Sequence, residues 1–303
     1  MNTNQEQRDF LEPKILAKLG ALPLFARKPM LGGVSGKHAS PHRGASVEFA
    51  EYRKYVPGDD LRRLDWRAYG RSDRFYVKEF EADTNLRMVL VLDTSGSMDF
   101  GSVGMTKLDY GRRLAATLSY LAVQQGDAVG LSCVAEKIHK SIPAKRNPAH
   151  LQTLFDILQE VEPQGETGLD EVLHELAETV RQRALVIILS DMFMEPTVMR
   201  DCFEHLRFRK HDVSVFHLLD PEELEFEFQR PTRFLDMEGG TPIFVEPNEI
   251  VDRYHQALRE YLDSVKQVVL ETGVDYRRVR LDTPYDQELT DFLVGRAVQG
   301  TSR

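Results

Sequence analysis

The sequence predicts an α/β protein built on a doubly wound, mostly parallel sheet, and three observations support this prediction. From Arg87 onward, strand patterns alternate with amphipathic helix patterns, as in repeated strand–helix units. Two of the strand patterns, 87–92 and 184–190 (ALVIILS), are continuously apolar, as strands buried on both faces should be. Several Pro and Gly residues break the alternation over 221–247, which we interpret as a β-like insertion late in the chain.

Hydrophobic periodicity places the elements of the main domain. The expected strands cover 87–92, 127–134, 137–142, 184–190, 212–219 and 274–281. The expected helices share apolar residues at three- and four-residue steps and cover 106–125, 148–161, 168–183, 196–209, 249–271 and 286–298. We expect Pro143 to end a short edge strand, and two short strands, 224–228 and 241–245, to lie in the insertion.

The chain of 303 residues is long enough for one large domain and a small appendage. Residues 87–303 form the predicted main domain, with its insertion at 221–247. Residues 1–86 form the predicted appendage: a helix over 6–19, strands over 46–56 and 74–80, and the polar block PGDDLRRLDW between these strands. This segment is too short and too polar for a strong core of its own, so we expect it to pack on the main domain.

The run LVLDTSGSM, residues 90–98, carries the clearest chemical signal of the chain. In an extended or turning segment, alternate residues point the same way, so Asp93, Ser95 and Ser97 can converge on one point. One carboxylate and two hydroxyls suit Mg²⁺ or Mn²⁺ and do not suit zinc. Further ligands should come from neighbouring strand ends, where Thr167 precedes a helix and Asp191 follows the most apolar strand.

Each of these residues also fits a helix cap, and the sequence leaves this alternative open. Asp93 or Ser95 is able to cap the helix that follows, and Thr167 with Asp170 is able to form a capping box. Asp191 fits less well as a cap for the helix at Pro196.

The Asp-x-Ser-x-Ser pattern at the end of a first strand resembles the metal-ion-dependent adhesion site of von Willebrand factor A domains. That resemblance implies a Rossmann-like sheet, a Thr in a Gly-rich loop (Thr167) and a second Asp (Asp191) as further ligands. It also implies a bound Mg²⁺, with Mn²⁺ or Ca²⁺ as alternatives, and an open coordination position that a partner's carboxylate fills. The function that it suggests is binding and not turnover.

From about Gly32 to its end, the chain resembles the domain-of-unknown-function 58 family, on the PGDDLRRLDW block together with DTSGSM. The resemblance implies a partnership with a MoxR-type AAA+ ATPase or its client. Many relatives carry membrane helices ahead of the block, and none is evident here, so we expect a soluble form. The mixed charges of the block form either a salt-bridge network or a partner contact; its residues are Asp59, Asp60, Arg62, Arg63, Asp65 and Trp66.

The leading functional prediction is a non-enzymatic, divalent-metal-dependent protein-binding adaptor. An Asp at a strand end beside a cation leaves open a metal-dependent phosphate-ester hydrolase. Residues 1–87 carry a net charge of +4 and the remainder −13, so nucleic-acid binding through the basic N-terminal third is a further alternative. The two cysteines imply no disulfide framework, and the first 20 residues lack the apolar run of a secretory signal. We therefore expect a cytoplasmic protein.

Overall fold

The computed structural model describes residues 8–24, 48–54, 76–81 and 86–301; for 48–54, 76–81 and 298–301 the description is of the backbone. Strands β1 (Glu48–Lys54) and β2 (Tyr76–Glu81) pair antiparallel, close to the two strands expected there. The PGDDLRRLDW block lies outside the described residues, and so do the side chains that would pack this segment on the main domain.

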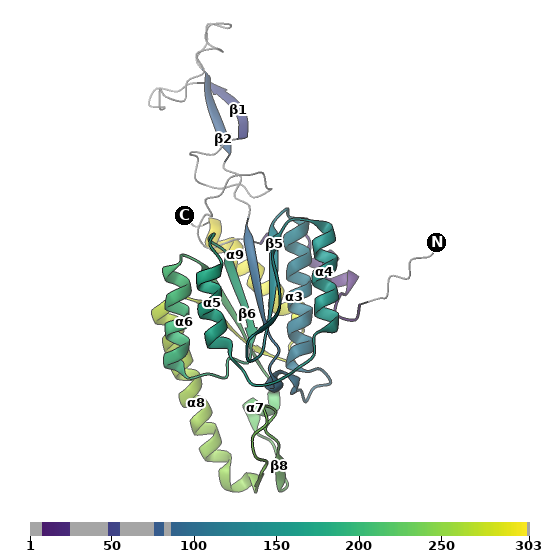
Figure 1. Ribbon diagram of the computed structural model, residues 1–303, viewed down its shortest axis with the longest axis vertical. Helices are drawn as coiled ribbons and strands as arrows, with labels where there is room; N and C mark the ends of the chain where they lie inside the picture. Colours follow the sequence, from purple (N-terminus) through teal and green to yellow (C-terminus); the bar gives the residue numbers. More distant parts are fainter. Residues whose placement is uncertain (1–7, 25–47, 55–75, 82–85, 302–303) are drawn as a thin grey trace, which may run out of the picture.

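A six-stranded sheet in the order β10-β7-β6-β3-β4-β5 forms the centre of the main domain (Figure 1). Its strands are β3 (Arg87–Asp93), β4 (Ala128–Val134), β5 (Ile138–Lys145), β6 (Leu185–Ser190), β7 (Asp212–Leu219) and β10 (Asp275–Arg280). All neighbours pair parallel except β4 and β5. The predicted mixed α/β fold with a mostly parallel sheet is confirmed, with β6 and β3 at its centre.

Helices cover both faces of this sheet. They are α1 (Pro13–Leu19), α3 (Lys107–Gln124), α4 (Pro148–Glu160), α5 (Leu169–Thr179), α6 (Pro196–Phe208), α8 (Pro247–Thr272) and α9 (Tyr285–Thr301). Side chains of a strand point alternately to its two faces. Accordingly Leu90 and Leu92 of β3 join the core under α3, α4 and α9, while Val91 joins the core under α5, α6 and α8.

Strand β5 continues to Lys145, so the expectation that Pro143 ends it is wrong. The strand lies at the edge of the sheet and pairs only with β4, where a register shift separates Val129 and Leu131. Proline lacks a backbone N–H, and an edge strand tolerates this loss because one side of the strand has no ladder to complete.

The expected strand at 224–228 is also wrong, because helix α7 (Pro221–Glu225) stands there. Asp220 and Glu223 form a capping box, and Pro221 occupies the first helical turn. Phe226 then ends the helix in the left-handed conformation, with φ 49°. The insertion contains two further short strands, β8 (Thr232–Phe234) and β9 (Ile243–Val245), which pair antiparallel.

The first helix starts at Pro13 and not at residue 6, because proline suits the first helical turn and residues 8–12 are not helical. Phe10, Leu19 and Leu24 nevertheless lie buried in the core beside α3 and α4. Residues 8–24 are thus docked on the main domain.

The N-terminal half of α8 extends beyond the carboxyl ends of the sheet strands, and the β8–β9 hairpin lies beside it (Figure 1). Burial reflects this, since the fully buried apolar residues Val265 and Val268 belong to the C-terminal half of α8. The insertion therefore stands at the edge of the sheet where Asp93 ends β3.

Arg296 of α9 provides a test of the packing. Its side chain is 2% exposed and forms ion pairs with Asp212 and Asp275. Removing one partner of a buried ion pair leaves an uncompensated charge, so we expect Arg296→Ala to lower the free energy of unfolding by about 3–5 kcal/mol. Urea denaturation measures this change.

Arg278 on β10 is exposed, so Arg278→Ala is the matched control and should change the free energy of unfolding by less than about 0.5 kcal/mol. Equal unfolding midpoints for the wild type and Arg296→Ala would contradict the role given to Arg296.

Candidate metal centre

The three residues of the Asp-x-Ser-x-Ser pattern converge at the end of β3. Asp93 is 1% exposed, and a 3₁₀ turn, η2 (Gly96–Asp99), follows it. The Asp93 Oδ1 atom accepts hydrogen bonds from the backbone N of Ser95 at 3.0 Å and from Ser95 Oγ at 2.7 Å. Ser95 Oγ lies 3.1 Å from Ser97 Oγ. One buried carboxylate and two hydroxyls thus form a continuous set of oxygen atoms.

The end of β6 adds a second hydroxyl–carboxylate pair. Parallel pairing of Leu92 with Leu189 brings the ends of β3 and β6 side by side. Ser190 Oγ donates to Asp93 Oδ2 at 2.6 Å. Asp191 follows directly and is 7% exposed. We did not predict Ser190 from the sequence; its one signal is that it ends the most apolar strand.

Lys107, in the first turn of α3, is a second residue that sequence reasoning missed. Its side chain is 2% exposed, and its Nζ atom lies 2.7 Å from Asp191 Oδ2 and 2.8 Å from Glu223 Oε1. Burial opposes the charge of Lys107, but the attraction of Asp191 and Glu223 outweighs it and raises the pKa of the amine. Lys107 therefore holds Asp191 in place and offsets part of the local negative charge.

One carboxylate oxygen at this strand edge has no partner. Asp191 Oδ1 is excluded from solvent and accepts no hydrogen bond within the described part of the chain. Burial, and then the charge of Asp191, raise the pKa of Asp93 to about 6. Burial lowers the pKa of nearby His217 to about 4, so His217 is neutral at neutral pH and offers no compensating charge. A cation would satisfy the Asp191 oxygen, so the site fits one.

The kind of ion follows from the donors. Across residues 8–24 and 86–301, no three His, Cys, Asp or Glu side chains are grouped to hold a metal, so the donor set depends on hydroxyls. A hydroxyl–carboxylate set of this kind suits a hard cation such as Mg²⁺.

Thr167 lies in a loop that packs against the Asp93 turn. The backbone N of Gly96 donates to Gly165 O at 2.9 Å, and the backbone N of Gln164 donates to Thr94 O at 2.8 Å. Gly165 adopts φ +67°, a conformation that favours glycine. The structure thus places Thr167, which is half-buried, in the loop next to Ser95 and Ser97.

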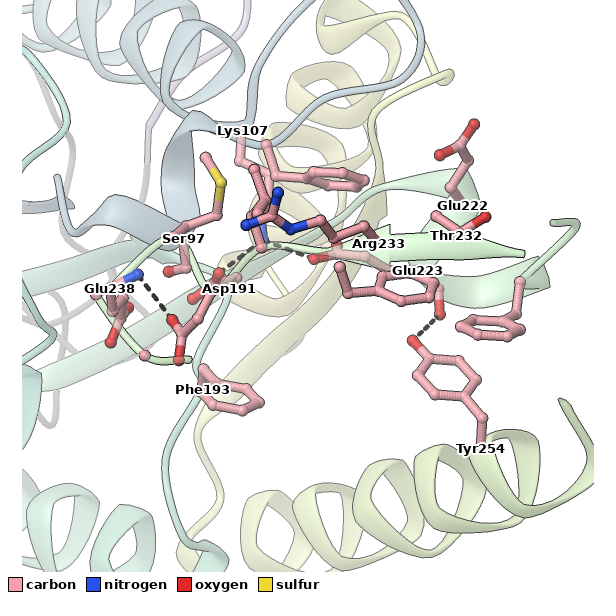
Figure 2. Close-up of a pocket in the computed structure, with 18 of the residues that line it drawn as sticks. Ser97, Lys107, Asp191, Phe193, Glu222, Glu223, Thr232, Arg233, Glu238 and Tyr254 are labelled. Atoms are coloured by element: carbon pink, nitrogen blue, oxygen red, sulfur yellow. Dashed lines mark hydrogen bonds and ion pairs between the residues drawn. The ribbon is translucent and has the colours of Figure 1, made fainter. Parts of the chain in front are cut away.

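The turn between β8 and β9 covers this edge from the outside. A Cβ atom on Gly96 would lie 2.1 Å from Met237 O, so the two turns are in direct contact. A cavity of about 760 Å³ opens between the turn, α7 and the start of α8. Ser97, Asp191 and Glu238 lie at one end of this cavity (Figure 2). Aromatic side chains line much of the rest, namely Phe100, Phe193, Phe226, Phe228, Phe234 and Tyr254.

The helix-cap alternatives are not observed. The cap residues of α5 and α6 are Gly168 and Glu195, not Thr167 and Asp191. Ser95 stands at the cap position of η2, but its side chain makes no cap hydrogen bond and turns to Asp93 instead. Ser95 therefore faces Asp93 at the sheet edge and does not cap the turn that follows.

Comparison with known sequences decides the family. Residues 51–263 match the family model described as "Protein of unknown function DUF58". The chain belongs to the DUF58 family. It is 26% identical to "Uncharacterized protein Rv1480" of Mycobacterium tuberculosis over 294 residues, which cover 95% of this chain and 92% of that protein. It is 29% identical to "Uncharacterized protein YeaD" of Bacillus subtilis over 106 residues, 35% of this chain and 24% of that protein.

Among solved structures, "conserved hypothetical protein BatB" from Bacteroides thetaiotaomicron matches with a TM-score of 0.47 and 16% identity. The match covers 71% of this DUF58 chain and 100% of that chain.

The described residues also bear on membrane-spanning helices and on the two cysteines. Within the residues described, no helix is both long and apolar enough to cross a bilayer. Cys133 in β4 and Cys202 in α6 are buried and free, as expected from a chain without a disulfide framework.

The raised pKa of Asp93 predicts a pH-dependent cost. In the folded state Asp93 binds its proton up to about pH 6, against an ordinary value of 3.8, so folding stability falls as pH rises between these values. One pKa unit corresponds to about 1.4 kcal/mol, so Asp93→Asn should raise the unfolding free energy by about 3 kcal/mol at pH 7.5 without metal, and have little effect at pH 3.5. Urea denaturation in EDTA over pH 3.5–7.5 measures the difference.

Asp99 lies in the same turn but is exposed, so Asp99→Asn is the control and should change little at any pH. An Asp93→Asn protein that is no more stable than the wild type at pH 7.5 would refute this account of the buried charge.

Proposed function

We propose that this DUF58 protein is a divalent-metal-dependent adaptor with a von Willebrand factor A-like domain, which binds a protein partner through its metal. The residues that would hold Mg²⁺, Mn²⁺ or Ca²⁺ are Asp93, Ser95, Ser97, Thr167 and Asp191. The observation that carries the proposal is the buried Asp191 Oδ1 atom, which lacks a partner beside a carboxylate with a raised pKa.

The protein's own residues fix this site before any ligand arrives. Ser95 and Ser190 orient both oxygens of Asp93, and Lys107 holds one oxygen of Asp191. Groups held in this way need little rearrangement when they bind. When bound, the ion supplies a positive centre that a partner's carboxylate is able to contact.

Charge supports a carboxylate as the incoming group. The buried cluster contains the carboxylates of Asp93, Asp191 and Glu223 and the ammonium of Lys107, a formal charge of −2. A divalent cation brings this cluster to neutrality. An acidic side chain would then approach without net repulsion, in a partly buried setting where Coulomb interactions are stronger than in water.

The expected partner is a MoxR-type AAA+ ATPase or its client. Membership of the DUF58 family supports this expectation, since the resemblance of the motifs implies such a partnership. We further propose that the protein is not an enzyme; phosphatase and nuclease assays with Mn²⁺ should show no turnover that depends on Asp93.

Metal binding is the first test. We expect wild-type protein to bind Mg²⁺ in calorimetry and Asp93→Ala to lose this binding, because the central carboxylate is gone. Asp99→Ala, an exposed residue of the same turn, should bind as the wild type does. Equal Mg²⁺ binding by wild type and Asp93→Ala would refute the site.

Partner binding is the second test. A pull-down from the native host should recover an AAA+ ATPase in Mg²⁺, lose it in EDTA and regain it when Mg²⁺ is restored. Ser95→Ala and Thr167→Ala should weaken recovery without unfolding the protein, because each removes one neutral hydroxyl. If the ATPase is recovered equally in EDTA and from Asp93→Ala, the metal does not bridge the two proteins.

A further inference from the structure

We propose that the cavity between the β8–β9 turn, α7 and the start of α8 receives an arginine side chain of the protein partner. This inference rests on the proposed function for the edge of the sheet at which the partner binds, and it adds the chemistry of a second contact beside the ion. Three features of the cavity carry it, namely its aromatic rings, its excess of carboxylates and its exposed apolar rim.

The aromatic rings of the cavity support one another. The ring of Phe226 stacks on that of Tyr254, with centroids 4.3 Å apart, and on that of Phe234, with centroids 5.7 Å apart. One ring of the lining already has a cation beside it, since Lys107 Nζ lies 5.9 Å from the centroid of Phe100. The faces of aromatic rings attract ammonium and guanidinium groups, so this lining suits a cation.

The lining carries more negative than positive charge. Its basic side chains are Lys107 and Arg233. Its acidic side chains are Glu166, Asp191, Glu222, Glu223, Asp236 and Glu238. Six negative and two positive charges give a formal charge of −4, and a bound divalent ion would leave −2. With or without the ion, the charge of the cavity therefore favours a cationic occupant.

The lining also has hydrogen-bond acceptors to spare. Asp191 Oδ1 and Glu238 Oε1 are excluded from solvent and accept no hydrogen bond within the described part of the chain. The proposed ion accounts for the first of these oxygens but not for the second. Glu222 is exposed on α7, at the opposite end of the cavity from Glu238 (Figure 2). A guanidinium carries several N–H donors on one planar group, and it pairs with carboxylates more strongly than a neutral donor does.

Exposed apolar side chains at the cavity indicate a protein partner and not a free small cation. Phe193, Leu235 and Met237 line the cavity and are exposed, Phe193 to 74%. Ile243 and Phe244 of β9 are exposed on the same hairpin. Exposed apolar side chains that gather in this way mark a surface at which proteins bind one another.

Other side chains fit the cavity less well. A leucine or phenylalanine would cover the carboxylates without pairing them, and burying an unpaired charge is costly. An acidic side chain would meet net negative charge away from the ion. A lysine ends in a compact ammonium, whereas the guanidinium of arginine stacks flat on aromatic faces. Arginine therefore matches both the rings and the carboxylates.

Nuclear magnetic resonance of the full chain tests this inference. Met237 lines the cavity, so its ¹³C-labelled methyl group reports on an occupant, and a Met237→Leu protein identifies its signal. In EDTA, the peptide acetyl-Gly-Arg-Gly-amide should shift this signal to saturation. The same peptide with citrulline in place of arginine keeps the shape of the side chain without its charge. It should bind about tenfold more weakly.

Two variants locate the binding. Phe193→Ala removes an exposed ring and Glu222→Gln removes an exposed charge, so neither should unfold the protein and each should weaken the arginine peptide severalfold. Both should bind Mg²⁺ as the wild type does, because neither residue belongs to the proposed metal site. Glu227→Gln is the matched control, since Glu227 is exposed on the same insertion but does not line the cavity. It should bind the peptide as the wild type does.

Equal binding of the arginine and citrulline peptides, or full binding by both Phe193→Ala and Glu222→Gln, would overturn the inference. The peptide titration is carried out in EDTA, so its result does not depend on the ion. A wild-type protein that binds Mg²⁺ but not the arginine peptide would overturn this inference alone. A wild-type protein that binds the peptide but no Mg²⁺ would overturn the proposed function alone.

Discussion

The buried charge of two carboxylates at adjacent strand ends is the constraint around which this edge of the fold is arranged. Because β3 and β6 pair in parallel, Asp93 and Asp191 leave the sheet at the same edge and raise each other's energy. Hydrogen bonds from Ser95 and Ser190 stabilise the first carboxylate, and Lys107 stabilises the second. The compensation is incomplete, since one oxygen of Asp191 lacks a partner. An apolar core alone would not require this arrangement.

Helix α7 and the β8–β9 hairpin of the insertion, together with the start of α8, pack over the edge of the sheet where β3 and β6 end. Helix α7 supplies Glu223 to Lys107, and the Tyr254 hydroxyl of α8 donates to the carbonyl of Glu223 at 2.6 Å. The N-terminal half of α8 therefore contacts the buried cluster through Glu223. The β8–β9 hairpin contacts it through Gly96. The cavity between them is lined by aromatic rings and is large enough for a partner's side chains.

Local patterns predicted most of the sheet, because strands buried on both faces leave continuous apolar runs; the run 212–219 agrees with β7 residue for residue. They also indicated Asp93, Ser95 and Ser97, whose convergence depends on backbone geometry over five residues. Lys107 reaches the site only through tertiary packing, so no spacing in the sequence marks it. Helix α7 was missed for a different reason. The alternating apolar residues of 224–228 were interpreted as a strand, and the capping box at Asp220, which indicates the start of a helix, was not considered.

The residues at this edge of the sheet divide into two kinds with different mechanical support. Asp93 ends one central strand and Asp191 follows the other, and each is held by a buried partner, so their positions are fixed by the core of the protein. The turn between β8 and β9 lies outside that core and is held by contacts to Gly96 and Thr167. In the proposed metal site, the rigid carboxylates would set which ion binds, because the cost of moving them excludes ions of the wrong size.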